Sequence, residues 1–518
     1  MTATPPPLTD GEASGYDRIA APTSPNDLPD RAAALFRDGY RLALVAGHDD
    51  RDVLRVVYLF TAAGPDRRVE LHLSVDREQP RLPSLASLSF PAGRFERELH
   101  DLFGIVPEDH PLPRRLVRHP HWPAGWYPMR HDAEPPPPFG NADEPYPFLT
   151  VEGPGVYEIP VGPVHAGLIE PGHFRFSVVG ETILKLKARL WYVHKGIERL
   201  FERRPLDGAI PLSERISGDT AVGHTLAHCE AVEDALQLEV PVEARRARVI
   251  LLELERVYNH IGDIGALCND AGHPILQAHA MRIKENLLRL NAETTGHRLL
   301  RGGVHIGGAA ILTAPDPAHL ATIAADIREI VDLALTNSLV AERFTGTAIL
   351  TVEQARDLGT LGYVARASGL DTDARRDHPT GGLHDYGPDL ADVLTVPVNH
   401  DGDVLARFQQ RAAELDASFA LLDTLVRTVS AGLVGGQTVD LRPAPHPATS
   451  GVGIVEGWRG TIVHRVEIDS DHRFTRCKIV DPSFLNWPAL PLALANTIVP
   501  DFPLANKSFN LSYAGNDL

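Results

Sequence analysis

The sequence predicts an α+β protein with two domains: a small N-terminal α/β-sandwich-like domain and a large, mainly α-helical bundle domain with small β regions. Three observations lead to this prediction. The chain has 518 residues, more than a single hydrophobic core usually holds. Its first part alternates strand-like and helix-like segments, whereas the remainder contains several long stretches of helical periodicity. A proline-rich stretch divides the two parts.

The composition excludes several classes of function. A hydrophobic content of 43% and a charged content of 23% are ordinary for a globular protein. The net charge of -18 argues against nucleic acid and anionic lipid as partners. No apolar stretch is long enough to span a bilayer, and the start lacks the features of a secretion signal. The three cysteines, Cys229, Cys268 and Cys477, cannot form a disulfide framework, which fits a cytoplasmic location.

The small domain is expected in residues 30–132, after a tail (residues 1–29) that is rich in Pro, Thr, Ser and Gly and that we expect to be disordered. Alternation of apolar and polar side chains is typical of half-buried strands. These patterns predict strands at 41–45, 53–60 and 69–75, and helices at 31–38 and 92–102. Residues 133–148 contain four consecutive prolines and are predicted to form a stiff linker.

The large domain is expected in residues 149–518 as a helical bundle. Apolar residues recur at helical spacing from Leu186 to Leu200, which predicts an amphipathic helix there. Apolar positions stepping by three and four predict a long core helix from Pro241 to about Leu267. Further helices are predicted at about 221–232, 278–300, 318–341 and 404–431, and strands at 176–179, 461–468 and 473–480.

One segment of the large domain has the pattern of a metal-binding motif without its ligands. Residues 215–224 are R-I-S-G-D-T-A-V-G-H. With cysteine at positions 217 and 220 this would be R-x-C-G-x-C-x-x-x-H, which resembles the first half of the nickel–iron site in [NiFe] hydrogenase large subunits. In that family the second half is D-P-C-x-x-C near the C-terminus, and its two cysteine positions fall on Ser512 and Gly515 here.

Other motifs extend this resemblance along the chain. The run E-R-E-x-x-D-L-F-G-I at 96–105 is similar to the signature of the C subunit of respiratory complex I. Motifs similar to the D subunit of complex I and to hydrogenase large subunits follow in the family's order. They are G-P-x-H at 162–165, E-P-G-H-F-R at 170–175, Y-V-H-K-G-I-E at 192–198, R-x-S-G…D-x-R-x-D-H-P at 366–379 and E-G-W-R-G at 456–460. The chain thus resembles the large subunits of formate hydrogenlyase and membrane-bound [NiFe] hydrogenases, with parts like the C and D subunits of complex I fused.

The resemblance implies a vacated metal site. Its four ligand positions are Ser217, Thr220, Ser512 and Gly515, none of which offers a thiolate. Nickel and iron in this family are held by soft sulfur ligands. We therefore expect no metal on this chain and no active hydrogenase.

The resemblance also assigns roles to residues that survive. Glu170 matches the residue that moves protons in hydrogenases, and Arg459 the arginine beside the metal's diatomic ligands. His224 matches the histidine near the adjoining iron–sulfur cluster of a partner. His165 matches a quinone-binding histidine in the D subunit of complex I, whose companion tyrosine position falls near Leu206. Motif order predicts that Glu170 and Arg459 share one interior pocket with the four vacated positions.

Considered without the resemblance, His224 and His228 stand four apart on one helix face, as in a zinc pair. The sequence H-E-x-x-H is absent, so a structural or supporting role is favoured. No glycine-rich dinucleotide loop follows a predicted strand, so NAD binding is not expected.

Two functions remain open at this point. The first is a catalytic-type oxidoreductase subunit, peripheral on the inner face of the cell membrane, that passes electrons from a partner iron–sulfur subunit toward quinone or another acceptor. The alternative is a non-catalytic structural coupling subunit that docks an electron-transfer partner to polytopic membrane subunits. In either case we expect the chain to bind no cofactor of its own except a quinone, and the iron–sulfur cluster to belong to the partner.

Overall fold

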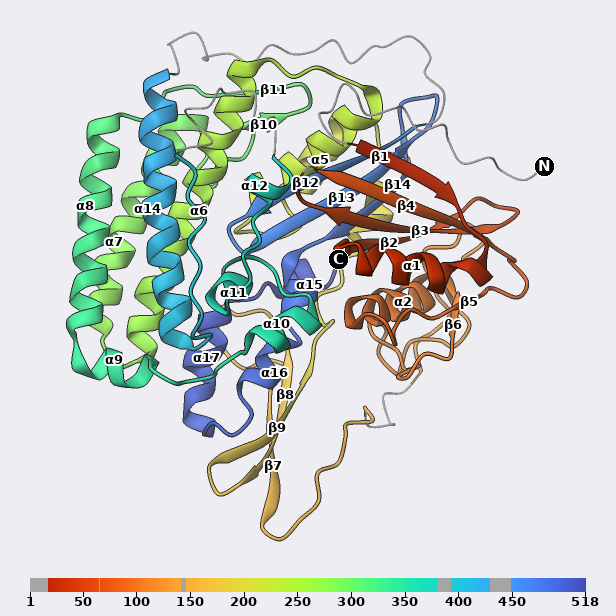
Figure 1. Cartoon of the computed structure of the whole chain (residues 1–518), viewed down its shortest axis with the longest axis horizontal. Coiled ribbons are helices and arrows are strands. Elements are labelled where there is room, and N and C mark those ends of the chain that lie inside the picture. Colours follow the sequence, from red (N-terminus) through yellow and green to blue (C-terminus); the bar gives the residue numbers. More distant parts are fainter. Residues whose placement is uncertain (1–16, 65, 141–145, 380–392, 429–448) are drawn as a thin grey trace.

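The N-terminal part of the computed structural model is a four-stranded sheet in the order β1-β4-β3-β2 (Figure 1). The structure describes residues 17–64, 66–140, 146–379, 393–428 and 449–518. Strand β3 is buried along its whole length, because neighbouring strands and helices cover both of its faces. The elements of this part are β1 (Asp17–Pro22), α1 (Leu28–Arg37), β2 (Arg41–Asp49), β3 (Leu54–Ala62), β4 (Arg67–Val75), β5 (Arg81–Pro83), α2 (Phe90–Phe103) and β6 (Val106–Glu108). The strands and helices predicted between residues 31 and 102 are confirmed.

The prediction of a disordered tail is wrong for residues 17–29; residues 1–16 lie outside the described part. Strand β1 pairs in parallel with β4. Arg18 holds it there, because its guanidinium donates to Glu70 at 2.9 Å and to Asp234 at 3.0 Å. Asp234 is 216 residues away in the sequence. The order of β1 therefore depends on distant partners that local composition does not reveal.

Long helices form the body of the large domain, as predicted. They are α6 (Val242–Asp270), α7 (Pro274–Thr295), α8 (Pro317–Thr336) and α14 (Val404–Thr428). The helix predicted to run to residue 341 is interrupted, because Asn337 is extended and its side chain accepts from two backbone N–H groups to begin α9 (Ser338–Phe344). Shorter helices between them are α10 (Val352–Leu358), α11 (Gly362–Ala367) and α12 (Ala374–Asp377). Within the described residues, none of the helices combines the length and hydrophobicity needed to cross a bilayer.

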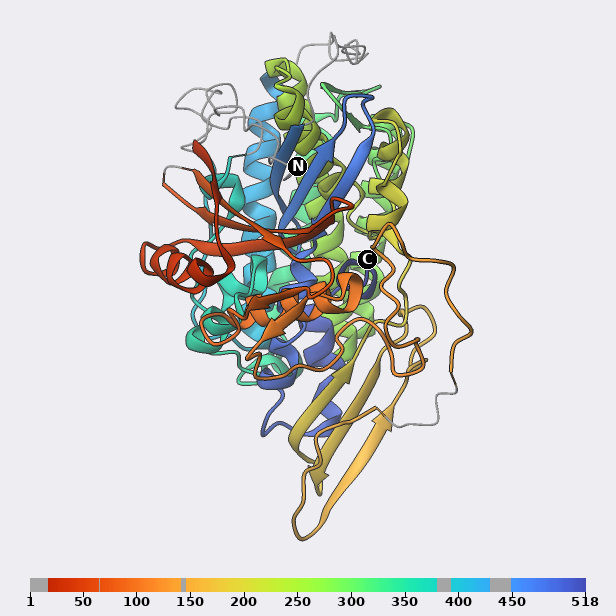
Figure 2. The same ribbon diagram turned by 90° about the vertical axis from the view of Figure 1, so that its right-hand side faces the viewer.

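The helix predicted from Leu186 to Leu200 is wrong. Strand β9 (Thr182–Arg189) occupies its first half and joins β8 (His173–Val179) and β7 (Val156–Val161) in an antiparallel sheet that extends away from the body (Figure 2). Only α3 (Ile197–Phe201) is helical. The residues I-L-K-L-K-A-R alternate with the period of a strand, and left-handed backbone at Trp191 (φ 66°) prevents a continuous helix.

A third sheet supports the motif helix. It contains β12 (Thr449–Gly457), β13 (Gly460–Ile468) and β14 (Phe474–Val480), and α5 (Ala221–Leu236) lies on it. A Cβ added at Gly453 would lie 2.0 Å from the carbonyl oxygen of Ala227, so α5 approaches β12 closely only because glycine stands there. Ion pairs from Arg55 to Glu467 and from Arg465 to Glu70 join this sheet to the N-terminal sheet.

Candidate functional site

The four vacated ligand positions lie together at the start of α5 and in the turn α18 (Tyr513–Asn516). We call Ser217, Thr220, Ser512 and Gly515 the frame. The hydroxyl oxygens of Ser217 and Ser512 are 2.9 Å apart, although 295 residues separate them in the sequence. Ser512 also accepts from the Gly515 N–H at 2.8 Å and so caps α18. The predicted juxtaposition of the two motif halves is therefore present.

Arg459 has an ion partner inside the frame. Its guanidinium donates to both carboxylate oxygens of Asp219, at 2.7 and 2.6 Å. Asp219 also accepts from the hydroxyls of Ser217 at 2.9 Å and Thr220 at 3.1 Å. The resemblance places Arg459 beside a metal. Here the positive charge of its guanidinium is neutralised by the Asp219 carboxylate of the same chain.

Asp481 occupies the place of the fourth ligand side chain. A Cβ built at Gly515 would lie 2.4 Å from the carboxylate carbon of Asp481. That carboxylate also bonds the Nε2 of His224 at 3.0 Å and accepts from the Ser483 N–H at 2.7 Å. Burial opposes ionisation, but the contact with His224 and the charge of Arg459 lower the pKa of Asp481.

Replacing Gly515 with alanine is expected to reduce the free energy of unfolding by about 1–3 kcal/mol, because the new methyl group would overlap Asp481. Gly218→Ala is the matched control, since no atom lies within 4 Å of a Cβ built there. Denaturant unfolding of both variants measures the difference. Equal midpoints for the two variants would contradict the assignment of Asp481 to this space.

His165 and Tyr513 lie at the edge of the frame. The Tyr513 hydroxyl is 3.4 Å from the His165 Nε2, although the two residues are 348 positions apart. Leu206, at the predicted tyrosine position, is a buried core residue with 4% exposure. The phenol that lies beside His165 therefore belongs to Tyr513 in the C-terminal turn. In the sequence, only the position of Tyr513 next to Ser512 could have indicated this contact. Burial raises the pKa of Tyr513, so the phenol remains neutral.

The position of the Glu170 side chain differs from the prediction. It is exposed, rather than buried in one pocket with Arg459, and its carboxylate accepts from the Ala514 N–H at 3.0 Å. Its environment is therefore the protein surface beside the C-terminal turn. The loop that carries it exposes three apolar side chains: Val164 (86%), Leu168 (103%) and Ile169 (46%). An apolar surface thus borders the His165–Tyr513 pair.

His224 is fully buried and links the frame to the third sheet. Its Nε2 bonds Asp481, and its Nδ1 is 3.2 Å from the Nε2 of His464. Its proposed place near a partner's iron–sulfur cluster stays a prediction. His228, one turn further along α5, packs against Phe201 and Phe474.

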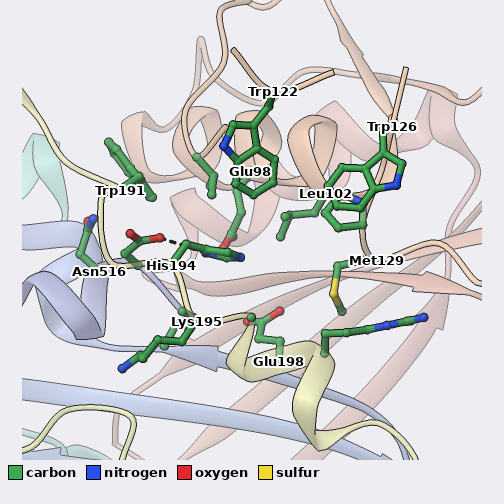
Figure 3. A pocket seen from close by; sticks show the side chains of 16 residues that line it. Glu98, Leu102, Trp122, Trp126, Met129, Trp191, His194, Lys195, Glu198 and Asn516 are labelled. Carbon is green, nitrogen blue, oxygen red and sulfur yellow. Dashed lines mark hydrogen bonds and ion pairs between the residues drawn. The ribbon is translucent and has the colours of Figure 1, made fainter. Parts of the chain in front are cut away.

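A pocket of about 310 Å³ lies between the N-terminal part and the C-terminal turn (Figure 3). Its wall is mainly aromatic and aliphatic, and His194 within it bonds Asp517 at 2.9 Å. Lys195 lines the pocket and donates to the Ile216 carbonyl at 2.8 Å, next to the frame. Its volume suits one small ring system. The apolar wall is formed by Leu102, Val117, Trp122, Trp126, Met129 and Trp191.

Two families match different parts of the chain. Residues 22–138 match the respiratory-chain NADH dehydrogenase, 30 Kd subunit. Residues 270–447 match the respiratory-chain NADH dehydrogenase, 49 Kd subunit. The two matches follow the predicted order, in which a part like the C subunit of complex I precedes a part like the D subunit.

Similar proteins cover most of the chain. Formate hydrogenlyase subunit 5 of Escherichia coli (strain K12) is 30% identical over 97% of this chain and 89% of its own. Hydrogenase-4 component G of the same organism is 30% identical over 100% and 91%. A C/D-type subunit of the NADH-quinone oxidoreductase of Bacteroides thetaiotaomicron is 30% identical over 73% and 75%. A chain of the membrane-bound sulfane sulfur reductase, an archaeal respiratory membrane complex, shares the fold, with a TM-score of 0.62 and 23% identity over 70% of this chain and 99% of that one.

Proposed function

The chain belongs to the family of fused 30 kDa- and 49 kDa-type subunits of respiratory-chain NADH dehydrogenase, and we propose that it is a peripheral subunit of a membrane-bound oxidoreductase. This family is related to the large subunits of formate hydrogenlyase and hydrogenase-4. It receives electrons from the iron–sulfur cluster of a partner on the inner face of the cell membrane. The acceptor is a quinone bound at His165 and Tyr513. No nickel–iron centre takes part.

The His165–Tyr513 pair is the observation that carries the proposal. Reduction of a quinone to a quinol adds two electrons and two protons at its two carbonyl oxygens. The His165 Nδ1 donates to the Pro163 carbonyl at 3.1 Å, so the Nε2 of the neutral ring is an acceptor, and the neutral phenol of Tyr513, 3.4 Å from that Nε2, is the group that can donate a hydrogen bond to a quinone carbonyl. The neighbouring exposed side chains of Val164 and Leu168 offer an apolar approach for a lipophilic acceptor.

The donors in the frame support a reaction without nickel and iron. The frame offers three hydroxyl groups and a glycine, and the two carboxylates beside it are already bonded, Asp219 to Arg459 and Asp481 to His224. Neutral hydroxyl groups are poor ligands for metals that select thiolate. These residues do not fit a nickel–iron centre.

The test is quinone reduction by the complex purified in mild detergent, after the partner cluster has been reduced by dithionite and the excess dithionite has been removed. Tyr513→Phe and His165→Gln are each expected to lower the rate with a soluble quinone about five- to tenfold, since one hydrogen bond is worth about 1–1.5 kcal/mol. Tyr157→Phe is the control, because Tyr157 is half exposed on the sheet edge and bonds only the Gly180 carbonyl among the described contacts. Rates equal to wild type in both test variants would exclude this site.

A structural coupling subunit is the second candidate. The Arg459–Asp219 ion pair and the Asp481–His224 contact favour it, because a frame whose polar groups satisfy one another needs no bound group. A complex that lacks quinone-dependent oxidation, yet loses its iron–sulfur subunit from the membrane when this chain is deleted, would support coupling over catalysis.

A further inference from the structure

Three buried side chains with metal-binding atoms converge between α5 and the third sheet. They are His228 on α5, His464 on β13 and Cys477 on β14, and one ligand atom of each lies within 4.8 Å of the other two. All three are 0% exposed. In the strand register Val466 pairs with Cys477 and His464 pairs with Ile479, so His464 and Cys477 share one face of the sheet. That face is covered by α5.

The two histidines have polar atoms without a partner. Neither ring nitrogen of His228, nor the Nδ1 of His464, has a hydrogen bond within the described part of the chain. A buried unsatisfied polar atom costs about 1–3 kcal/mol, and such atoms in native proteins require an explanation. Phe201 and Phe474 flank the His228 ring with centroids at 5.0 and 5.1 Å. A water among these atoms would have only the two imidazoles and the Cys477 thiol as polar partners, at the low end of the two to four that buried waters have.

A chain of hydrogen bonds prepares His464 as a ligand. When His224 donates its Nε2 proton to Asp481, its Nδ1 accepts the Nε2 proton of His464; the two contacts are 3.0 and 3.2 Å. The Nδ1 of His464 then carries a free lone pair. Metal-binding histidines usually have their second ring nitrogen fixed by a carboxylate, a carbonyl or a water in this way.

We propose that His228, His464 and Cys477 form a three-coordinate copper(I) site. Two imidazoles and one thiolate in a trigonal arrangement are the ligand set of protein copper centres. Binding exchanges the thiol proton for the metal: Cys-SH and Cu⁺ give Cys-S-Cu and H⁺. The resulting site is electrically neutral, as full burial requires.

Zinc fits this site less well than copper(I). Zinc is almost always four-coordinate in structural sites, and a divalent ion would leave one uncompensated positive charge. Ligand bonds of about 2.0–2.3 Å place trigonal ligand atoms about 3.5–3.7 Å apart. Closing the cluster from a spread of up to 4.8 Å therefore needs a movement of about 1 Å.

Competition with a chromophoric copper(I) chelator tests the site on the full chain, purified without oxygen. Wild type is expected to bind one equivalent of copper(I), with one sulfur and two nitrogen neighbours in X-ray absorption. Cys477→Ser and His228→Gln are expected to lose that equivalent. Cys268→Ser is the control, since Cys268 is also buried but lies outside the cluster, at the end of α6.

Thermal unfolding shows whether a variant that fails to bind copper is still folded. Copper(I) is expected to raise the melting temperature of wild type and of Cys268→Ser, but not that of Cys477→Ser, whose melting temperature without metal serves as the reference. Retention of copper by Cys477→Ser would overturn the proposal. So would stoichiometric binding of zinc(II) in preference to copper(I). Neither result depends on whether quinone is the electron acceptor.

Discussion

Replacing Arg366 with methionine is expected to lower the free energy of unfolding by about 3–5 kcal/mol. Its guanidinium donates to Glu414 at 2.9 Å and to Glu456 at 2.8 Å, and lies 3.3 Å from Asp373. All four side chains are 0% exposed. Methionine keeps most of the apolar stem of arginine but removes the positive charge that the three buried carboxylates share. Removing one partner of a buried ion pair is strongly destabilising, because the other partner is left buried without a compensating charge.

Arg376→Met is the control for this prediction. Arg376 lies in the same motif, pairs with Asp371 and Asp377, and has a side chain that is 42% exposed. Exposed pairs contribute about 1 kcal/mol or less. Urea unfolding followed by far-UV circular dichroism compares the two variants with wild type. An Arg366→Met midpoint no lower than that of Arg376→Met would show that the buried cluster does not stabilise the fold.

Secondary structure was predictable wherever one period dominated the sequence. The alternation of β4 and the three-and-four stepping of α6 each permit one interpretation, and both elements are present. Between Leu186 and Leu200 the leucines fit both periods, and the sequence L-K-L-K at 184–187, which alternates apolar and charged residues, favours a strand. Strand β1 was not predictable, because the contacts that order it come from Glu70, Asp234 and Ser450.

The closeness of the frame positions was predictable from motif order, whereas the side chain that fills the space beside Gly515 was not. Ser217 and Ser512 meet as expected because each stands at a matched position of a family motif. Asp481 belongs to none of the motifs that we matched, and its role follows only from its closeness to Gly515. The position of Tyr513 beside His165 was missed for a related reason, because Tyr513 comes from a segment 348 positions away and belongs to none of the matched motifs.

Several motif residues hold the two domains together. Glu198, from the Y-V-H-K-G-I-E motif, pairs with Arg476 at 2.6 Å and with Lys478 at 3.0 Å. Lys478 in turn pairs at 2.8 Å with Glu98, from the E-R-E-x-x-D-L-F-G-I motif on α2. A signature that identifies the family by sequence is here a buried ion cluster between an N-terminal helix and the third sheet. These motif residues therefore have a structural role that does not depend on a metal.

Replacing Glu198 with glutamine is therefore expected to destabilise the chain by about 3–5 kcal/mol at pH 7, because Arg476 and Lys478 lose their shared carboxylate. Burial opposes ionisation of Glu198, but these two cations lower its pKa to about 2. Its ordinary pKa in an unfolded chain is about 4.3. A folded pKa below the unfolded one contributes stability above about pH 4.3 and loses it as the pH falls toward 2.

The stability difference between wild type and Glu198→Gln should consequently stay constant from about pH 5 to pH 8 and shrink below about pH 4. Glu285→Gln is the control, because Glu285 pairs with Arg298 and the two side chains are 39% and 51% exposed, so a much smaller loss of stability is expected. Denaturant unfolding at several pH values measures both differences. A stability difference that grew in acid would have the opposite sign to the one that a lowered pKa requires, and would show that the charge of Glu198 is not stabilised by Arg476 and Lys478.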